Sequence, residues 1–168
     1  MPYPTKKLGE NIEDKSKDSR ILFSILTGRN SHILTIVIVG HLLTEHLLDK
    51  IITAKFKNKR SNPKESFSQK LELLYPMWLP LFIYKNIKLL NESRNDIAHN
   101  LGSIDYKPFI YTHRGEKKIV KIPKRKNEEK FYFRELINTV LFDLVNYSSD
   151  TLGISNDIDL NIIFRQKN

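Results

Sequence analysis

The 168-residue chain has no cysteine, only six glycines and no long uninterrupted apolar run. Without cysteine, a disulfide framework, a thiol nucleophile and a cysteine-ligated zinc site are excluded. The scattered glycines provide no glycine-rich phosphate loop. The most apolar stretch, Ile33 to Leu43, is interrupted by Thr35, Gly40 and His41. It falls short of the roughly 18–20 apolar residues that span a bilayer. The first residues are polar and charged and lack the apolar core of a secretory signal. We therefore expect a soluble, cytoplasmic protein without a membrane partner.

The chain does contain enough apolar residues for a core, and it carries an excess of basic charge. Hydrophobic residues make up 40%, and the length suits a single domain. The 28 Lys and Arg residues exceed the 19 Asp and Glu residues, giving a net charge of +9. Such an excess favours an anionic partner, with RNA, DNA or a membrane surface as the usual candidates.

The basic excess is concentrated in two segments. Residues 55–70 carry six basic and one acidic residue, and residues 100–130 carry nine basic and four acidic residues. Solubilising loops are one interpretation, and an anion-binding face that flanks the functional site is the other. On the second interpretation we expect one aromatic and six basic residues to bind RNA. They are Lys57, Lys59, Arg60, Lys124, Arg125, Lys126 and Tyr111.

Apolar periodicity predicts an all-α fold, an up-and-down bundle of four to five helices with a small inserted β-hairpin. Apolar residues at three- and four-residue intervals predict helices over about 20–28, 31–56, 67–75, 79–99 and 130–148. A buried strand at 36–39 is the alternative for one β-branched run, but the helical period continues past it. Two β-prone runs around a turn predict the hairpin at about 108–122.

The expected domain organisation is an N-terminal tail over 1–16, one helical domain over 17–150 and a C-terminal extension over 151–168. In the extension Ile158, Leu160, Ile162 and Phe164 alternate with other residues. This alternation fits a short strand, and it equally fits an extended tail docked on the bundle.

One stretch of the predicted 79–99 helix combines a guanidinium, an amide and an imidazole: Arg94, Asn95 and His99. Asn95 and His99 are four residues apart and share a helix face. Arg94 and His99 are five apart, about 140° around the helix, so one helix aims them poorly at one small target. An imidazole moves protons at neutral pH, and a guanidinium stabilises charge on a phosphorane. RNA cleavage without metal is chemistry that this set supports.

Structural roles for the same residues are also open. His99 can stabilise a helix end through its charge. Arg94 falls between Leu90 and Ile97 on the predicted apolar stripe, where a guanidinium needs a partner. Glu45 and Asp49 are the expected partners.

Two further constellations carry less weight. His41, Glu45 and His46 lack the spacing of a zinc motif, so no metal site is expected. No helix-turn-helix pattern with a basic recognition helix supports a DNA-binding regulator.

The stretch Arg-Asn-Asp-Ile-Ala-His, preceded by a long helix that carries Glu45, resembles the signature of the HEPN superfamily, and most of all its mannitol operon repressor-like branch. The resemblance covers about residues 31–101 and, more loosely, the last helix. It implies a metal-independent endoribonuclease of toxin–antitoxin or phage-defence type, without cofactor, in which two copies of the motif face each other across a homodimer cleft. Arg94 and His99 would be catalytic, and Asn95 would orient the imidazole or the phosphate. The resemblance also implies a cognate antitoxin or regulatory protein as a further partner. A non-catalytic module of the same fold, binding RNA or a protein, is the alternative.

Overall fold

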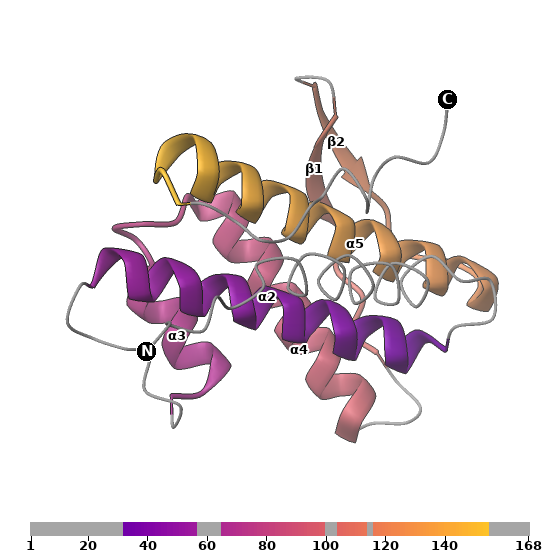
Figure 1. The fold of residues 1–168 in the computed structure, drawn as a ribbon. Helices are drawn as coiled ribbons and strands as arrows, with labels where there is room; N and C mark the ends of the chain where they lie inside the picture. The colour runs from indigo at the N-terminus through magenta and orange to yellow at the C-terminus, as the bar shows by residue number, and fades with distance from the viewer. Residues whose placement is uncertain (1–31, 57–64, 100–103, 114–115, 155–168) are drawn as a thin grey trace, which may run out of the picture.

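The computed structural model describes residues 32–56, 65–99, 104–113 and 116–154. In this part of the chain the long helices α2 (Ile33–Lys55), α4 (Leu81–His99) and α5 (Lys126–Asn146) form a bundle. The short α3 (Phe67–Leu74) packs against α2 and α4, and the π-helical turn η1 (Tyr147–Thr151) continues α5. Figure 1 shows α2 and α5 running side by side in the same direction, with α4 crossing them the opposite way.

Local sequence signals set where the helices begin. Ser66 and Gln69 form a reciprocal capping box at the start of α3: the Ser66 hydroxyl accepts from the Gln69 N–H at 3.3 Å, and the Gln69 amide oxygen accepts from the Ser66 N–H at 2.8 Å. This arrangement satisfies two helix-end donors. At the start of α5, Glu128 and Glu129 place negative charge in the first turn, where the helix dipole favours it.

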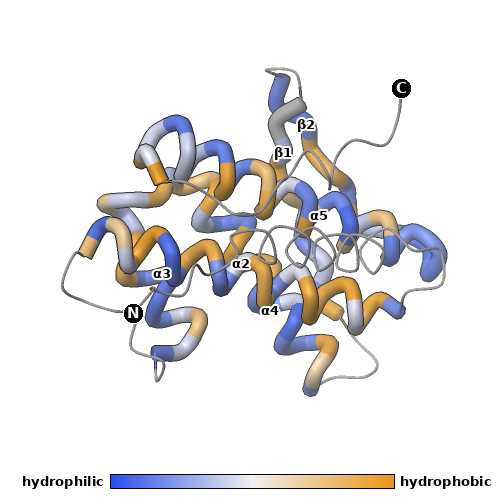
Figure 2. The backbone as a smooth tube through the Cα atoms, in the orientation of Figure 1, coloured by the Kyte–Doolittle hydropathy of each residue, from blue (hydrophilic) through white to orange (hydrophobic). Residues whose placement is uncertain are grey.

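The inner faces of α2, α4 and α5 share one apolar core, and Figure 2 shows hydrophobic stretches along α2. At the crossing of α2 and α5 the backbones approach closely at Gly40. A Cβ atom added there would lie 2.6–2.7 Å from three side-chain carbons of Ile137. Glycine is therefore what allows α2 to pack this tightly on α5. Fully buried members of the core include Ile36, Leu48, Ile87, Leu90, Phe133 and Leu141.

A two-stranded antiparallel hairpin, β1 (Phe109–His113) and β2 (Glu116–Val120), is fixed to both α4 and α5. The buried Phe109 ring packs edge-on against Tyr132 of α5, with ring centroids 5.3 Å apart. The Tyr132 hydroxyl donates to the Lys107 carbonyl at 2.6 Å. From α4, the Asn86 amide donates to the Ile110 carbonyl at 2.9 Å. The hairpin therefore sits in a defined position beside the bundle.

The structure confirms the predicted all-α bundle with a small hairpin. The helices predicted over 31–56, 67–75 and 79–99 correspond to α2, α3 and α4, and the hairpin lies inside the predicted 108–122. The helix predicted from residue 130 begins instead at Lys126, because the acidic pair in its first turn supports an earlier start. The predicted helix over 20–28, the tail over 1–16 and the alternating segment 158–164 lie outside the described residues. The predicted domain boundaries stay predictions.

Candidate functional site

The Arg94, Asn95 and His99 side chains are all exposed at the C-terminal end of α4. Arg94 Nη1 donates to Asn95 Oδ1 at 3.0 Å, so the amide orients the guanidinium from the neighbouring position. A guanidinium has five N–H donors, so this bond leaves most of them available to a second acceptor. The end of α4 thus presents a cation, an amide and an imidazole to solvent within two helical turns.

Arg94 does not lie on the apolar stripe of α4, and this part of the sequence prediction is wrong. The buried polar position on this stretch is Ser93, whose side chain is 2% exposed. One residue along a helix turns the side chain by about 100°. Ser93 faces the core, and Arg94 turns outward at the edge of the bundle. The apolar periodicity around this position was too coarse to distinguish these neighbours.

The predicted ion pair of Arg94 with Glu45 or Asp49 is also wrong, because Lys70 of α3 binds both carboxylates. Lys70 Nζ lies 2.8 Å from Glu45 Oε1 and 2.9 Å from Asp49 Oδ1. The Lys70 side chain is 6% exposed, whereas the two acids are 28% and 32% exposed. Burial lowers the pKa of Lys70, but the two carboxylates raise it by more, so the net pKa lies above its ordinary value. The ammonium stays charged and holds α3 on α2.

His41 of α2 lies between the core and the motif. Its Nε2 is 3.0 Å from Asn91 Oδ1, and its ring stacks on Phe67 with centroids 4.0 Å apart. Because the partner atom is a carbonyl oxygen, Nε2 carries the proton and donates. Burial lowers the pKa of His41, the Asn91 bond opposes this, and the nearby Arg94 charge lowers it further. The internal hydrogen bond expected for His41 is therefore present, and the imidazole is held neutral and fixed beside α4.

Sequence analysis missed Lys70, Asn91 and Ser68 as parts of this region. Asn91 bridges two elements, since its Nδ2 donates to Ser68 Oγ at 3.3 Å while its Oδ1 accepts from His41. The only local signal for Lys70 was the spacing of Glu45 and Asp49 four residues apart on α2, which presents two carboxylates on one face. Lys70 is 21 and 25 residues away along the chain, so the signal did not identify it.

The side of α4 that faces residues 104–107 carries mainly acidic groups. Glu92 binds Lys107 at 2.8 Å, and Asp96 accepts from the Asp105 backbone N–H at 3.3 Å. Part of the basic segment 100–130 therefore does border the motif helix, but its local charge is not an excess of cations. Because Glu92 and Asp96 would repel an anion on that side of α4, an anion would approach the motif more easily from the side of Arg94.

The predicted RNA-binding residues fall into two groups. Lys57, Lys59 and Arg60 lie outside the described residues. Lys124, Arg125 and Lys126 are exposed at the start of α5. Tyr111 is partly buried and lines one hollow of about 430 Å³ together with Lys124. Figure 1 places the first turn of α5 and the last turn of α4 at separate corners of the molecule. Residues 124–126 therefore do not flank the motif of the same chain.

Among the described residues, no group of three His, Asp or Glu side chains is arranged to hold a metal ion. None of the helices in those residues combines the length and apolar character needed to cross a membrane. No protein-family model, curated protein or solved structure matches the chain.

Proposed function

We propose that the protein is a metal-independent endoribonuclease, with Arg94, Asn95 and His99 acting at the C-terminal end of α4. The support is the chemistry of these three groups, their exposure, and the resemblance of their sequence to the HEPN motif. The proposed substrate is RNA, and the proposed enzyme is of toxin or phage-defence type. A homodimer is the proposed active form.

One observation carries the proposal: the Arg94 guanidinium is exposed while the acids expected to neutralise it are bound elsewhere. Lys70 engages both Glu45 and Asp49, and the hydrogen bond formed by Arg94 goes to the neutral amide of Asn95. An arginine with open donors, and with no neutralising carboxylate among the residues that the structure describes, is suited to bidentate binding of a phosphate.

The proposed roles follow from ordinary acid–base chemistry. His99 takes the proton from the attacking 2′-hydroxyl, or gives one to the departing 5′-oxygen. Arg94 stabilises the negative charge that builds on the phosphorane. The roughly 140° between the two residues on one helix is the reason to expect a second copy, since an imidazole and a guanidinium from two α4 helices can meet at one phosphate.

An exposed apolar stripe on α2 supports the proposed dimer. Leu34, Ile38 and Leu42 recur every four residues and are 44%, 39% and 57% exposed. They lie on the helix that also carries His41, which hydrogen-bonds Asn91 of α4 at 3.0 Å. A contiguous exposed apolar surface of this kind is typical of a protein–protein interface.

The test is RNA cleavage in the presence of EDTA by wild-type protein and by the Arg94→Ala and His99→Ala variants. We expect each variant to lose about 100-fold or more of the cleavage rate, because His99→Ala removes a general acid or base and Arg94→Ala removes electrostatic stabilisation of the transition state. His46→Ala is the matched control, because this histidine is also exposed but sits on α2. Its activity should equal wild type, and circular dichroism should show all variants folded.

Equal cleavage by wild type and His99→Ala would contradict the proposal, as would no cleavage by either at high protein concentration. RNA binding that needs Arg94 but gives no cleavage would instead identify a non-catalytic RNA-binding module. For the dimer, Ile38→Glu should shift the mass in light scattering from two copies to one and reduce cleavage. A monomeric wild type with full activity would refute that part.

A further inference from the structure

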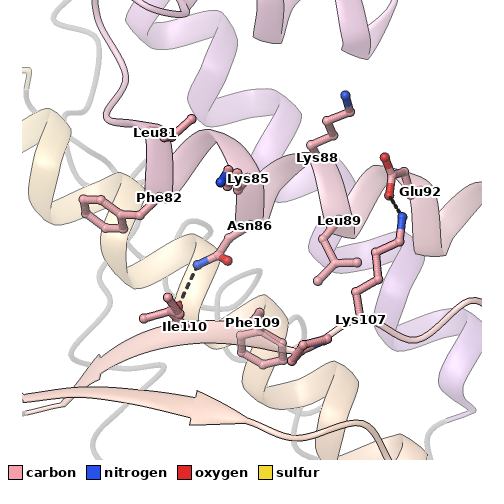
Figure 3. Close-up of a pocket in the computed structure, with 11 residues that line it drawn as sticks. Leu81, Phe82, Lys85, Asn86, Lys88, Leu89, Glu92, Lys107, Phe109 and Ile110 are labelled. Atoms are coloured by element: carbon pink, nitrogen blue, oxygen red, sulfur yellow. Dashed lines mark hydrogen bonds and ion pairs between the residues drawn. The ribbon is translucent and has the colours of Figure 1, made fainter.

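A groove of about 610 Å³ lies between α4 and the residues that lead into β1. Figure 3 shows its apolar lining, with Leu89 and Phe109 facing each other across it. Leu81, Phe82 and Ile110 form its apolar rim and are 50%, 42% and 44% exposed. A concave surface with this much exposed apolar area marks a binding site.

The charges around the groove are ordered along α4. Lys85 and Lys88 are exposed on the half of the groove nearer the start of α4. Glu92 borders the other half, where it binds Lys107. Figure 3 shows Lys85, Lys88 and Glu92 in this order along α4, with the Lys88 side chain pointing away from β1 and the Glu92 carboxylate bound to Lys107. Because the Glu92–Lys107 pair has no net charge, a complementary occupant carries acidic residues at the Lys85 and Lys88 end and needs no net charge at the other end.

The chain itself contains a segment with this pattern. In residues 155–168, Asp157 and Asp159 come first, and Arg165 and Lys167 follow. Between them Ile158, Leu160, Ile162 and Phe164 stand at alternate positions. In an extended chain alternate side chains share one face, so these four form an apolar face while both aspartates point the other way.

The described chain ends near the entrance of the groove. The Leu152 carbonyl accepts from Lys55 Nζ at 3.2 Å, and the same ammonium lies 5.1 Å from the ring centre of Trp78. Trp78 precedes Leu81, the first groove residue, by three positions. The fourteen residues after Ile154 extend to about 46 Å. The groove follows α4 from Leu81 to Glu92, about 16 Å, so the segment is long enough to fill it.

We propose that the groove between α4 and β1 is the docking site of the chain's own segment 155–168, bound in extended conformation along α4. The apolar face packs on Leu89, Phe109 and Ile110. The two aspartates, on the outer face of the segment, lie near the long side chains of Lys85 and Lys88 at the rim. This inference does not rest on RNA cleavage.

Disulfide mapping tests the proposal directly, because the natural chain has no cysteine to interfere. The full-length double variant Lys88→Cys/Asn161→Cys places one thiol on the groove rim and one in the segment, and keeps Lys85 and both aspartates. The matched control is Thr53→Cys/Asn161→Cys. Thr53 is exposed on α2 two residues before Lys55, so it is close to Leu152 but outside the groove.

With oxidised glutathione, intact mass and non-reducing gels report how fast each pair closes within one chain. We expect the groove pair to close at least about tenfold faster than the control, since docking raises the local thiol concentration. Adding Lys85→Glu should remove most of that advantage. Equal rates for the two pairs would overturn the proposal. Disulfides formed mainly between two chains would also overturn it, in favour of a second copy as the occupant.

Hydrogen exchange of unmodified protein provides a second, independent measurement. Amides of residues 158–164 should be protected in wild type, and the protection should fall to that of a free peptide in Lys85→Glu/Lys88→Glu. Exchange at the free-peptide rate in wild type would refute docking. Unchanged protection in the charge variant would refute the proposed charge recognition.

Discussion

Replacing Lys70 with methionine removes the ammonium that joins α3 to α2 while keeping a side chain of similar length. The ammonium bonds Glu45 and Asp49 at 2.8–3.0 Å and is nearly buried. Hydrogen bonds to charged groups contribute about 1.5–3 kcal/mol each. The carboxylates are 28% and 32% exposed, so they regain water when Lys70 is lost. We therefore expect the free energy of unfolding to fall by only about 2 kcal/mol in total.

The assay is urea unfolding followed by circular dichroism, with Lys118→Met as the matched control. Lys118 is 46% exposed and lies 3.8 Å from the exposed Glu116 carboxylate. Removing an exposed pair of this kind costs less than about 0.5 kcal/mol. Lys70→Met should therefore lower the urea midpoint clearly, and Lys118→Met should leave it nearly unchanged.

The Lys70 variant also tests why Arg94 is available. Without Lys70, the carboxylates of Glu45 and Asp49 lose their cation and compete for the guanidinium, so RNA cleavage should fall together with stability. A loss of stability below about 0.5 kcal/mol would refute the account of Lys70 as the clamp between α2 and α3. Lower stability with full cleavage would separate the clamp from the site.

Three further changes test the packing, the electrostatics and the capping of the fold. Gly40→Ala should destabilise by about 1–3 kcal/mol in urea unfolding, because the branched Ile137 side chain cannot withdraw from the added methyl group; an unchanged midpoint would show that the helices separate freely. Burial raises the pKa of Asp143 to about 6, so the folded state binds this proton more tightly than the unfolded state, and stability is lost as pH rises from about 4 to 6. Asp143→Asn should therefore have the same free energy of unfolding as wild type near pH 4 and be about 1 kcal/mol more stable at pH 7.5. This value is reduced because the carboxyl is partly exposed. Equal stability of variant and wild type at both pH values would contradict the shift. Ser66→Ala should cost about 1 kcal/mol by breaking the capping box with Gln69, and a thermal melt identical to wild type would exclude that role.

The helices were predictable because their cores repeat at the helical period over many residues. In α2 the buried positions Ile36, Val37, Gly40, Leu47 and Ile51 follow this period closely. The hairpin was predictable from its β-prone runs and intervening turn. Apolar periodicity does not predict the start of α5, because residues 126–130 are all polar, whereas Glu128 and Glu129 support one more turn.

The surroundings of the motif were less predictable, because they depend on contacts between residues far apart in the chain. The motif itself is a local pattern, and the sequence located it on α4. Whether Arg94 is buried depends on a shift of one residue along α4. Whether Glu45 and Asp49 can bind it depends on where α3 places Lys70. Periodicity and residue spacing contain no information on either point.

The most direct test of the central claim is analysis of the RNA ends produced in EDTA by wild-type protein and by His99→Ala. Attack by the 2′-hydroxyl, assisted by His99, predicts fragments with 2′,3′-cyclic phosphate and 5′-hydroxyl ends from wild type and none from the variant. Fragments with 5′-phosphate ends, cleavage that stops when EDTA is added, or identical products from His99→Ala would contradict the account.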